Sequence, residues 1–155
     1  MLQRIQSIYL LFAGLVIAAL FLFPLVHNVY VNSKPVTIMI TGIYQDVNGQ
    51  SAHTEFFTAL TVATALVALL PIALIFMYNN RKRQIALCYG LMLVVIAYSY
   101  WVSQAVKSTI GDAYLNMSNY GIGIILLSLS LLLIVLAQKS IQKDEKLVKS
   151  ADRLR

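Results

Sequence analysis

The 155 residues are 59% hydrophobic and only 12% charged, and twelve lysines and arginines against six acidic residues give a net charge of +6. Soluble domains are typically about 25% charged, so this composition excludes an ordinary soluble domain of this length, and the excess apolar surface must face lipid. The positive charge is assigned to membrane topology, because the sequence has no motif for reading nucleic acid, and nucleic-acid binding is not expected. The single cysteine, Cys88, cannot form a disulfide within one chain.

The first predicted membrane span is residues 7–26, an uncharged run that follows Arg4. At a rise of 1.5 Å per residue, this run is long enough to cross a hydrocarbon core of about 30 Å. A signal peptide is the alternative, but the run exceeds the usual signal core of about 7–15 residues and no clear Ala-x-Ala site follows it. We therefore expect a retained helix, which Pro24 stops or kinks near its end.

A long polar segment, residues 27–55, follows and is expected to lie outside the membrane as an outer loop. Residues 35–41 carry β-branched side chains in partial alternation, which is typical of a strand. Residues 29–31 are a plausible antiparallel partner, and Asn48-Gly49 marks a second turn. The segment predicts a small β-hairpin cap of two or three strands, which should lie against the helix ends because a lone hairpin is only marginally stable.

The second and third predicted spans are residues 56–78 and 84–106, joined by an inner turn at 79–83 that contains Arg81-Lys82-Arg83. A charge at the bilayer centre costs about 2.5–3.5 kcal/mol on insertion scales, so this turn must lie at a membrane face. The positive-inside rule makes that face cytoplasmic.

The second span carries a stripe of small residues at three- and four-residue spacing. Such stripes let membrane helices approach closely, so we expect this face to pack on a neighbour. Gly14 and Ala18 offer a matching small pair in the first span, and Pro71 is expected to kink the second helix. The stripe consists of Thr58, Thr61, Ala65 and Ala68.

Residues 107–119 form a second outer loop, residues 120–137 a fourth span, and residues 138–155 a charged cytoplasmic tail. This alternation places ten of the twelve lysines and arginines inside and leaves only Lys34 and Lys107 outside. The predicted fold is therefore an all-α membrane protein, a bundle of four transmembrane helices with the β cap outside and both termini cytoplasmic.

The chemistry-bearing residues give little support to an enzyme. The four predicted spans contain no acidic, basic or histidine residue, which counts against a pump, a coupled transporter or an aspartate-based intramembrane protease. His27, His53 and Glu55 are a plausible zinc-ligand set, but their spacing is not diagnostic, and anchoring of helix ends is the simpler interpretation. We expect no catalytic residue, no cofactor and no metal.

The cytoplasmic tail is the most informative polar feature. Read as a continuation of the fourth helix, it has a basic stripe and an apolar face, so it is predicted to be an amphipathic helix that contacts a cytoplasmic protein partner or anionic lipid. A solvated tail with no specific role is the alternative. The candidate contact residues are Lys143, Lys146, Leu147, Val148, Lys149, Ala151, Arg153 and Leu154.

Both ends of the chain resemble a known family. MLQRIQS at residues 1–7 and KDEKLVKSADRLR at residues 143–155 are similar to the ends of an uncharacterised family of small four-span bacterial inner-membrane proteins, a domain of unknown function. The resemblance implies a multi-pass protein of the bacterial inner (plasma) membrane with no assigned activity, and it carries over no catalytic residue.

Together these observations predict a non-enzymatic integral membrane protein, an accessory or interaction subunit that uses its tail. The alternative is a transporter or channel for a neutral or lipidic solute, with a polar route formed by the threonines of the second span and by Tyr98, Ser103 and Gln104 of the third. A homo-oligomer is a further alternative, because small-residue stripes also serve contacts between chains.

Overall fold

A computed structural model describes residues 3–31, 34–47, 50–77, 81–111 and 117–152. The chain forms four α-helices, two short 3₁₀ turns and a four-stranded sheet. In chain order the elements are α1 (Gln3–Ala18), η1 (Ala19–Phe21), β1 (Val26–Val31), β2 (Lys34–Met39), β3 (Gly42–Val47), β4 (Gln50–Phe56), α2 (Thr58–Ile75), α3 (Arg81–Ile110), η2 (Met117–Asn119) and α4 (Ile122–Asp152).

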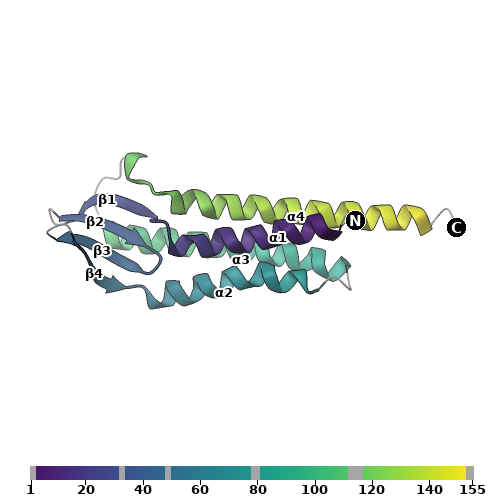
Figure 1. The fold of residues 1–155 in the computed structure, drawn as a ribbon, viewed down its shortest axis with the longest axis horizontal. Helices are drawn as coiled ribbons and strands as arrows, with labels where there is room; N and C mark the ends of the chain where they lie inside the picture. The colour runs from purple at the N-terminus through teal and green to yellow at the C-terminus, as the bar shows by residue number, and fades with distance from the viewer. Residues whose placement is uncertain (1–2, 32–33, 48–49, 78–80, 112–116, 153–155) are drawn as a thin grey trace.

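The four helices run side by side, and the sheet lies at one end of them (Figure 1). We call the four packed helices the helical body, the end that carries the sheet the sheet end, and the opposite end the far end. α1 contacts both α2 and α4, and α3 contacts the same two helices. The N-terminus of α1 lies at the far end, and the C-terminal part of α4 extends beyond the other helices there (Figure 1).

The buried residues of every helix recur at alternating three- and four-residue spacing, the 3.5-residue period of coiled-coil packing. Large aliphatic and aromatic side chains cover the remaining faces, where Leu66, Leu93 and Ile125 are each at least 60% exposed. The body is thus apolar on both its inner and its outer surface. The buried rows are Gln6, Leu10, Ala13, Ile17 and Leu20 in α1; Leu60, Thr64, Val67, Pro71 and Leu74 in α2; Gln84, Cys88, Leu91, Val95, Tyr98 and Val102 in α3; and Leu127, Ser130, Ile134, Ala137, Ile141 and Asp144 in α4.

Three helices, α2, α3 and α4, are long and apolar enough to cross a membrane, and α1 with η1 forms a shorter apolar helix over residues 5–21. The first helix therefore ends earlier than the predicted span at 7–26. Pro24 cannot continue a helix, and the residue before it is disfavoured in the helical conformation. Leu25 instead donates its amide to the Ile38 carbonyl at 2.9 Å, which starts the sheet.

The sheet is antiparallel with strand order β1-β2-β3-β4. The predicted pairing of residues 29–31 with the next strand is confirmed by the register Val29↔Val36. The prediction of two or three strands missed β4, whose sequence QSAHTEF is polar and poor in β-branched residues. β4 pairs along β3 from Val47↔Gln50, and the predicted turn at Asn48-Gly49 lies outside the described residues.

The start of α4 is bonded to the start of the sheet. The Gly121 amide donates to the Leu25 carbonyl at 2.8 Å, and the Gly123 amide donates to the Pro24 carbonyl at 3.0 Å. A Cβ at Gly121 would stand only 2.2 Å from the Pro24 oxygen, so this close approach requires glycine. The first and last helices are thereby joined at the sheet end.

At the far end, the predicted boundary at the basic turn is corrected. Arg81-Lys82-Arg83 forms the first turn of α3 and not the connection before it, while residues 78–80 lie outside the described part. Buried Gln84 donates its Nε2 to the Leu74 carbonyl of α2 at 3.2 Å. This bond holds the start of α3 against α2, and the three cations that precede Gln84 form the first turn of α3.

The predicted small-residue stripe of α2 is only partly confirmed. A Cβ at Gly14 would lie 2.9 Å from the Ala68 oxygen, so α1 and α2 do approach closely there. Thr58 and Ala65, however, are exposed. The helix buries a different row, rotated toward Thr64 and Val67, because apolar side chains fill the 3.5-residue positions better than the small stripe does.

Candidate functional site

The predicted tail is indeed helical, but its boundary differs from the prediction. α4 runs without a break to Asp152, and Ile141 and Asp144 are buried at 0% and 8% exposure. These two residues belong to the predicted cytoplasmic tail at 138–155, yet they pack into the helical body because they occupy its 3.5-residue core positions. The part of the helix that projects beyond the body starts later. We call residues 145–152 the α4 extension.

The α4 extension carries the exposed members of the predicted contact set. Lys143 and Lys146 are exposed on either side of its start, and Leu147 and Val148 are 49% and 44% exposed. The side chains of Lys149 and Ala151 lie outside the described part of the chain, although both residues are within α4. Arg153 and Leu154 lie outside the described residues altogether.

Val148 continues the buried row of α4. It follows Ala137, Ile141 and Asp144 at spacings of four, three and four residues, which is the period of all four helices. Helix α1, which covers that row, begins at Gln3, and α4 projects past it (Figure 1). The extension therefore presents the next core position of a helical packing without a covering helix among the described residues.

The far end of the body also holds buried amide side chains. Gln6, Gln84 and Gln138 are each at most 5% exposed. Gln138 donates its Nε2 to the Tyr89 hydroxyl of α3 at 2.8 Å, whereas the Oε1 atoms of Gln6 and Gln84 have no partner among the described residues. The bonds join α2, α3 and α4 just beneath the extension and so fix the direction in which it projects.

Of the residues of the predicted polar route, Thr64 and Tyr98 are brought together, while Ser103 and Gln104 lie apart from them on the surface. Tyr98 donates its hydroxyl to Thr64 at 2.5 Å, and Thr64 donates to the Leu60 carbonyl at 2.6 Å, so both hydroxyls are satisfied inside the body. Ser103 and Gln104 are exposed on the surface of α3. The sequence interpretation named both Tyr98 and the threonines of the second span, and the structure joins Tyr98 to one of those threonines, Thr64.

The histidines of the hypothetical zinc set are also apart. His27 is in β1 and His53 is in β4, the two edge strands of the sheet. Within the described ranges, no group of three or more His, Cys, Asp or Glu could hold a metal ion. The His53 ring packs instead against Tyr44 and Phe56, with ring centroids 4.4 and 3.9 Å away.

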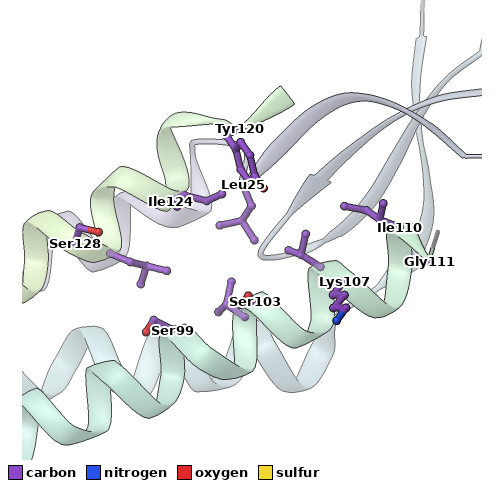
Figure 2. A pocket seen from close by; sticks show the side chains of 12 residues that line it. Leu25, Ser99, Ser103, Lys107, Ile110, Gly111, Tyr120, Ile124 and Ser128 are labelled. Atoms are coloured by element: carbon purple, nitrogen blue, oxygen red, sulfur yellow. The ribbon is translucent and has the colours of Figure 1, made fainter. Parts of the chain in front are cut away.

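The structure reveals a cleft that the sequence did not predict. It lies between α3 and α4 at the sheet end, beneath Leu25, and has a volume of about 570 Å³ (Figure 2). Its walls combine aliphatic side chains with the hydroxyls of Ser99, Ser103 and Ser128. In the sequence, the only sign of this cleft is the recurrence of serine on otherwise aliphatic helices. Serine is also common at contacts between membrane helices, so its recurrence does not by itself predict a cleft.

Comparison with known families covers almost the whole chain. The model of a domain of unknown function, DUF4293, matches residues 2–154. The chain belongs to the DUF4293 family. This confirms the resemblance to an uncharacterised family. No curated protein and no solved structure matches the chain.

The function of this DUF4293 protein is therefore inferred from its geometry. Two features could bind a partner or ligand: the α4 extension, which continues the buried row of α4 beyond the neighbouring helices, and the cleft at the sheet end. The extension contains three described residues of the predicted contact set with exposed side chains, Lys146, Leu147 and Val148, and a fourth, Lys143, lies two residues before it.

Proposed function

We propose that this DUF4293 protein is a non-enzymatic accessory subunit that binds a helical segment of a cytoplasmic protein through its α4 extension. In this proposal the protein spans the bacterial inner membrane four times, with both termini in the cytoplasm and the sheet outside. The observation that carries the proposal is Val148, which occupies the next position of the buried row of α4 and is 44% exposed.

The four-span topology is supported by charge and length. Ten of the twelve lysines and arginines fall on one side, as the positive-inside rule requires of a cytoplasmic face. The shortest apolar helix, residues 5–21, has 17 residues, which is the lower end of the range for a membrane-spanning helix of about 17–25 residues. Its packing against α2 and α4 favours a crossing alongside them.

A protein partner fits the direction of the extension better than a lipid surface does. Leu147 lies ten residues beyond Ala137, about 15 Å farther along an unbroken helix. Helices that bind membrane surfaces lie in the interface plane, with their apolar face buried about 5–10 Å deep. A helix that continues straight out of the membrane carries Leu147 and Val148 away from that layer.

The charges near the extension define the chemistry of the partner. Lys143 and Lys146 are exposed beside the apolar pair Leu147 and Val148. A partner helix with an apolar stripe and flanking acidic residues would complement this surface, because complementary charges steer association and fix register.

The bonding of the polar route favours this role over transport. Thr64 and Tyr98 are bonded to each other, and Ser103 and Gln104 are exposed. A solute route for the alternative, a transporter or channel, would need such groups to face a common passage.

The test is affinity purification in mild detergent from the native host, followed by mass spectrometry. Val148→Asp places a charge at the packing position, and Ser150→Asp is the matched control, because it adds the same charge to an exposed position of the same turn. We expect a stoichiometric cytoplasmic partner with the wild type and with Ser150→Asp, and its loss with Val148→Asp. Retention of the partner by Val148→Asp, or purification of a solitary wild-type protein, would contradict the proposal.

A further inference from the structure

The cleft at the sheet end exists because α3 and α4 meet at one end and separate at the other. At the far end the two helices are joined by the bond from Gln138 to Tyr89. At the sheet end, Leu25 enters from the chain before β1, and the bonds to Gly121 and Gly123 hold the start of α4 on that chain. Figure 2 shows Leu25 above the gap between the two helices.

The residues that line the cleft change from apolar inside the cleft to polar and charged toward the sheet end. The cleft's volume of about 570 Å³ falls within the range of about 300–1,000 Å³ for small-molecule sites. Val102 and Leu127 are buried apolar wall residues, while Tyr120 and Lys107 are exposed toward the sheet end. Lys107 is the one charged residue among the described residues that line the cleft, so a charged ligand there would be anionic.

Two serines of the cleft have hydroxyls that no other described residue uses. Ser99 donates its hydroxyl to the Ile96 carbonyl at 2.8 Å. Ser103 and Ser128, in contrast, form no side-chain hydrogen bond with the described part of the chain and are exposed. Both residues line the cleft, Ser103 from α3 and Ser128 from α4 (Figure 2), and their hydroxyls are available to an ester or phosphate oxygen.

The depth of the cleft matches the boundary between hydrocarbon and headgroups. Ser103 lies 20 residues after Arg83, the last cation of the basic cluster. Twenty residues of helix span about 30 Å, the thickness of the hydrocarbon core. Ser99 and Ser128 then lie just inside the core, and Lys107 lies one turn beyond it, at the level of the headgroups.

We propose that this cleft binds one anionic phospholipid of the outer leaflet. An acyl chain packs against Val102, Val106 and Leu127, the ester region reaches Ser103 and Ser128, and the headgroup phosphate meets Lys107. Figure 2 shows the Lys107 amino group at the rim and directed away from Leu25, where its flexible four-carbon stem can follow a headgroup. The site is independent of the α4 extension, which lies at the opposite end of the molecule (Figure 1).

The test is native mass spectrometry of the full chain, delipidated in detergent and then titrated with phosphatidylglycerol or phosphatidylethanolamine of identical acyl chains. Ser128→Phe fills the cleft, and Ala97→Phe is the matched control, because Ala97 is an exposed residue of α3 that does not line it. We expect one saturable phosphatidylglycerol with the wild type and with Ala97→Phe. Ser128→Phe should weaken binding by about tenfold or more.

The charge is tested separately. Lys107→Gln should remove the preference for phosphatidylglycerol over phosphatidylethanolamine, whereas Lys143→Gln, at the far end, should leave it intact. Thermal unfolding followed through Trp101 must be unchanged in each variant. Equal lipid occupancy in Ser128→Phe and Ala97→Phe would overturn the proposal, since it would indicate annular lipid only. A dimer that covers the cleft without bound lipid, seen directly in the mass, would also overturn it.

Discussion

At the scale of the residue, polar side chains mark the inside of this protein. Gln6, Thr64, Gln84 and Ser130 are buried at 3.5-residue positions, and Gln138 is buried beside the row of α4, whereas most large aliphatic side chains outside those rows are exposed. In lipid there is no hydrophobic driving force between helices, so packing and hydrogen bonds decide which face turns inward. In this protein, a bulky apolar residue is therefore a poor predictor of burial, whereas an uncharged polar residue in a helix is a good one.

The Thr64–Tyr98 bond should show measurable coupling. Thr64→Val leaves the Tyr98 hydroxyl, which is 4% exposed, without its acceptor. We expect Thr64→Val and Tyr98→Phe each to destabilise the protein, and the double variant to cost less than their sum. The coupling energy should be about 0.6–1.7 kcal/mol, the range of hydrogen bonds between membrane helices. Unfolding in detergent measures it, and additive effects of the two substitutions would contradict the assignment.

Gly121 should tolerate no side chain. An added Cβ would stand 2.2 Å from the Pro24 oxygen, a backbone atom that cannot move without disturbing the sheet. Gly121→Ala is expected to destabilise the protein by about 1–3 kcal/mol. Gly90→Ala is the control, because a Cβ there meets no atom within 4 Å, and it should be neutral or stabilising. Equal unfolding temperatures of the two variants would refute the close contact.

At the scale of the element, the sequence predicted an element correctly where its residue types differ from those of its neighbours, and it failed where they do not. The strand at residues 35–41 and its pairing were recognisable from β-branched residues, but β4 was hidden by its polar sequence. The buried rows were missed because the lipid-facing sides are equally apolar. The predicted tail is part of a continuous helix, α4, but its residues Ile141 and Asp144 are buried in the core.

The orientation of the α4 extension can be tested through helix phase. One alanine inserted after Glu145 turns the following residues by about 100° and moves Val148 out of its row, whereas seven inserted residues preserve the coiled-coil phase. We expect the single insertion to abolish co-purification of the cytoplasmic partner and a seven-residue helical insertion to restore it. Equal recovery from both proteins would show that the face of the extension is irrelevant.

At the scale of the whole molecule, the two ends are chemically different. The sheet end carries a mixed-polarity sheet, a cleft and aromatic residues such as Tyr120 and Trp101, while the far end carries the basic residues of the first turn of α3 and of the C-terminal part of α4. In the proposed topology, the positive-inside rule makes this asymmetry favour the orientation with the far end in the cytoplasm.

That orientation can be measured with a membrane-impermeant maleimide. In a Cys88→Ala background, Thr54→Cys in β4 should be labelled in intact cells, because Thr54 is exposed on the sheet. Ser150→Cys in the α4 extension, and Gln3→Cys at the start of α1, should react only after the membrane is opened. Labelling of Gln3→Cys in intact cells would show that α1 does not cross.

The junction of the first and last helices has a consequence for biosynthesis. α1 leaves the ribosome first, yet one of its principal packing partners is α4, and the glycines that receive Pro24 lie nearly a hundred residues later in the chain. Until that segment is translated, the buried row of α1, including Gln6, has only α2 to cover it. The packing of α1 can therefore be completed only after α4 has been translated, and a chain that ends before Gly121 would leave the α4-facing side of α1 uncovered.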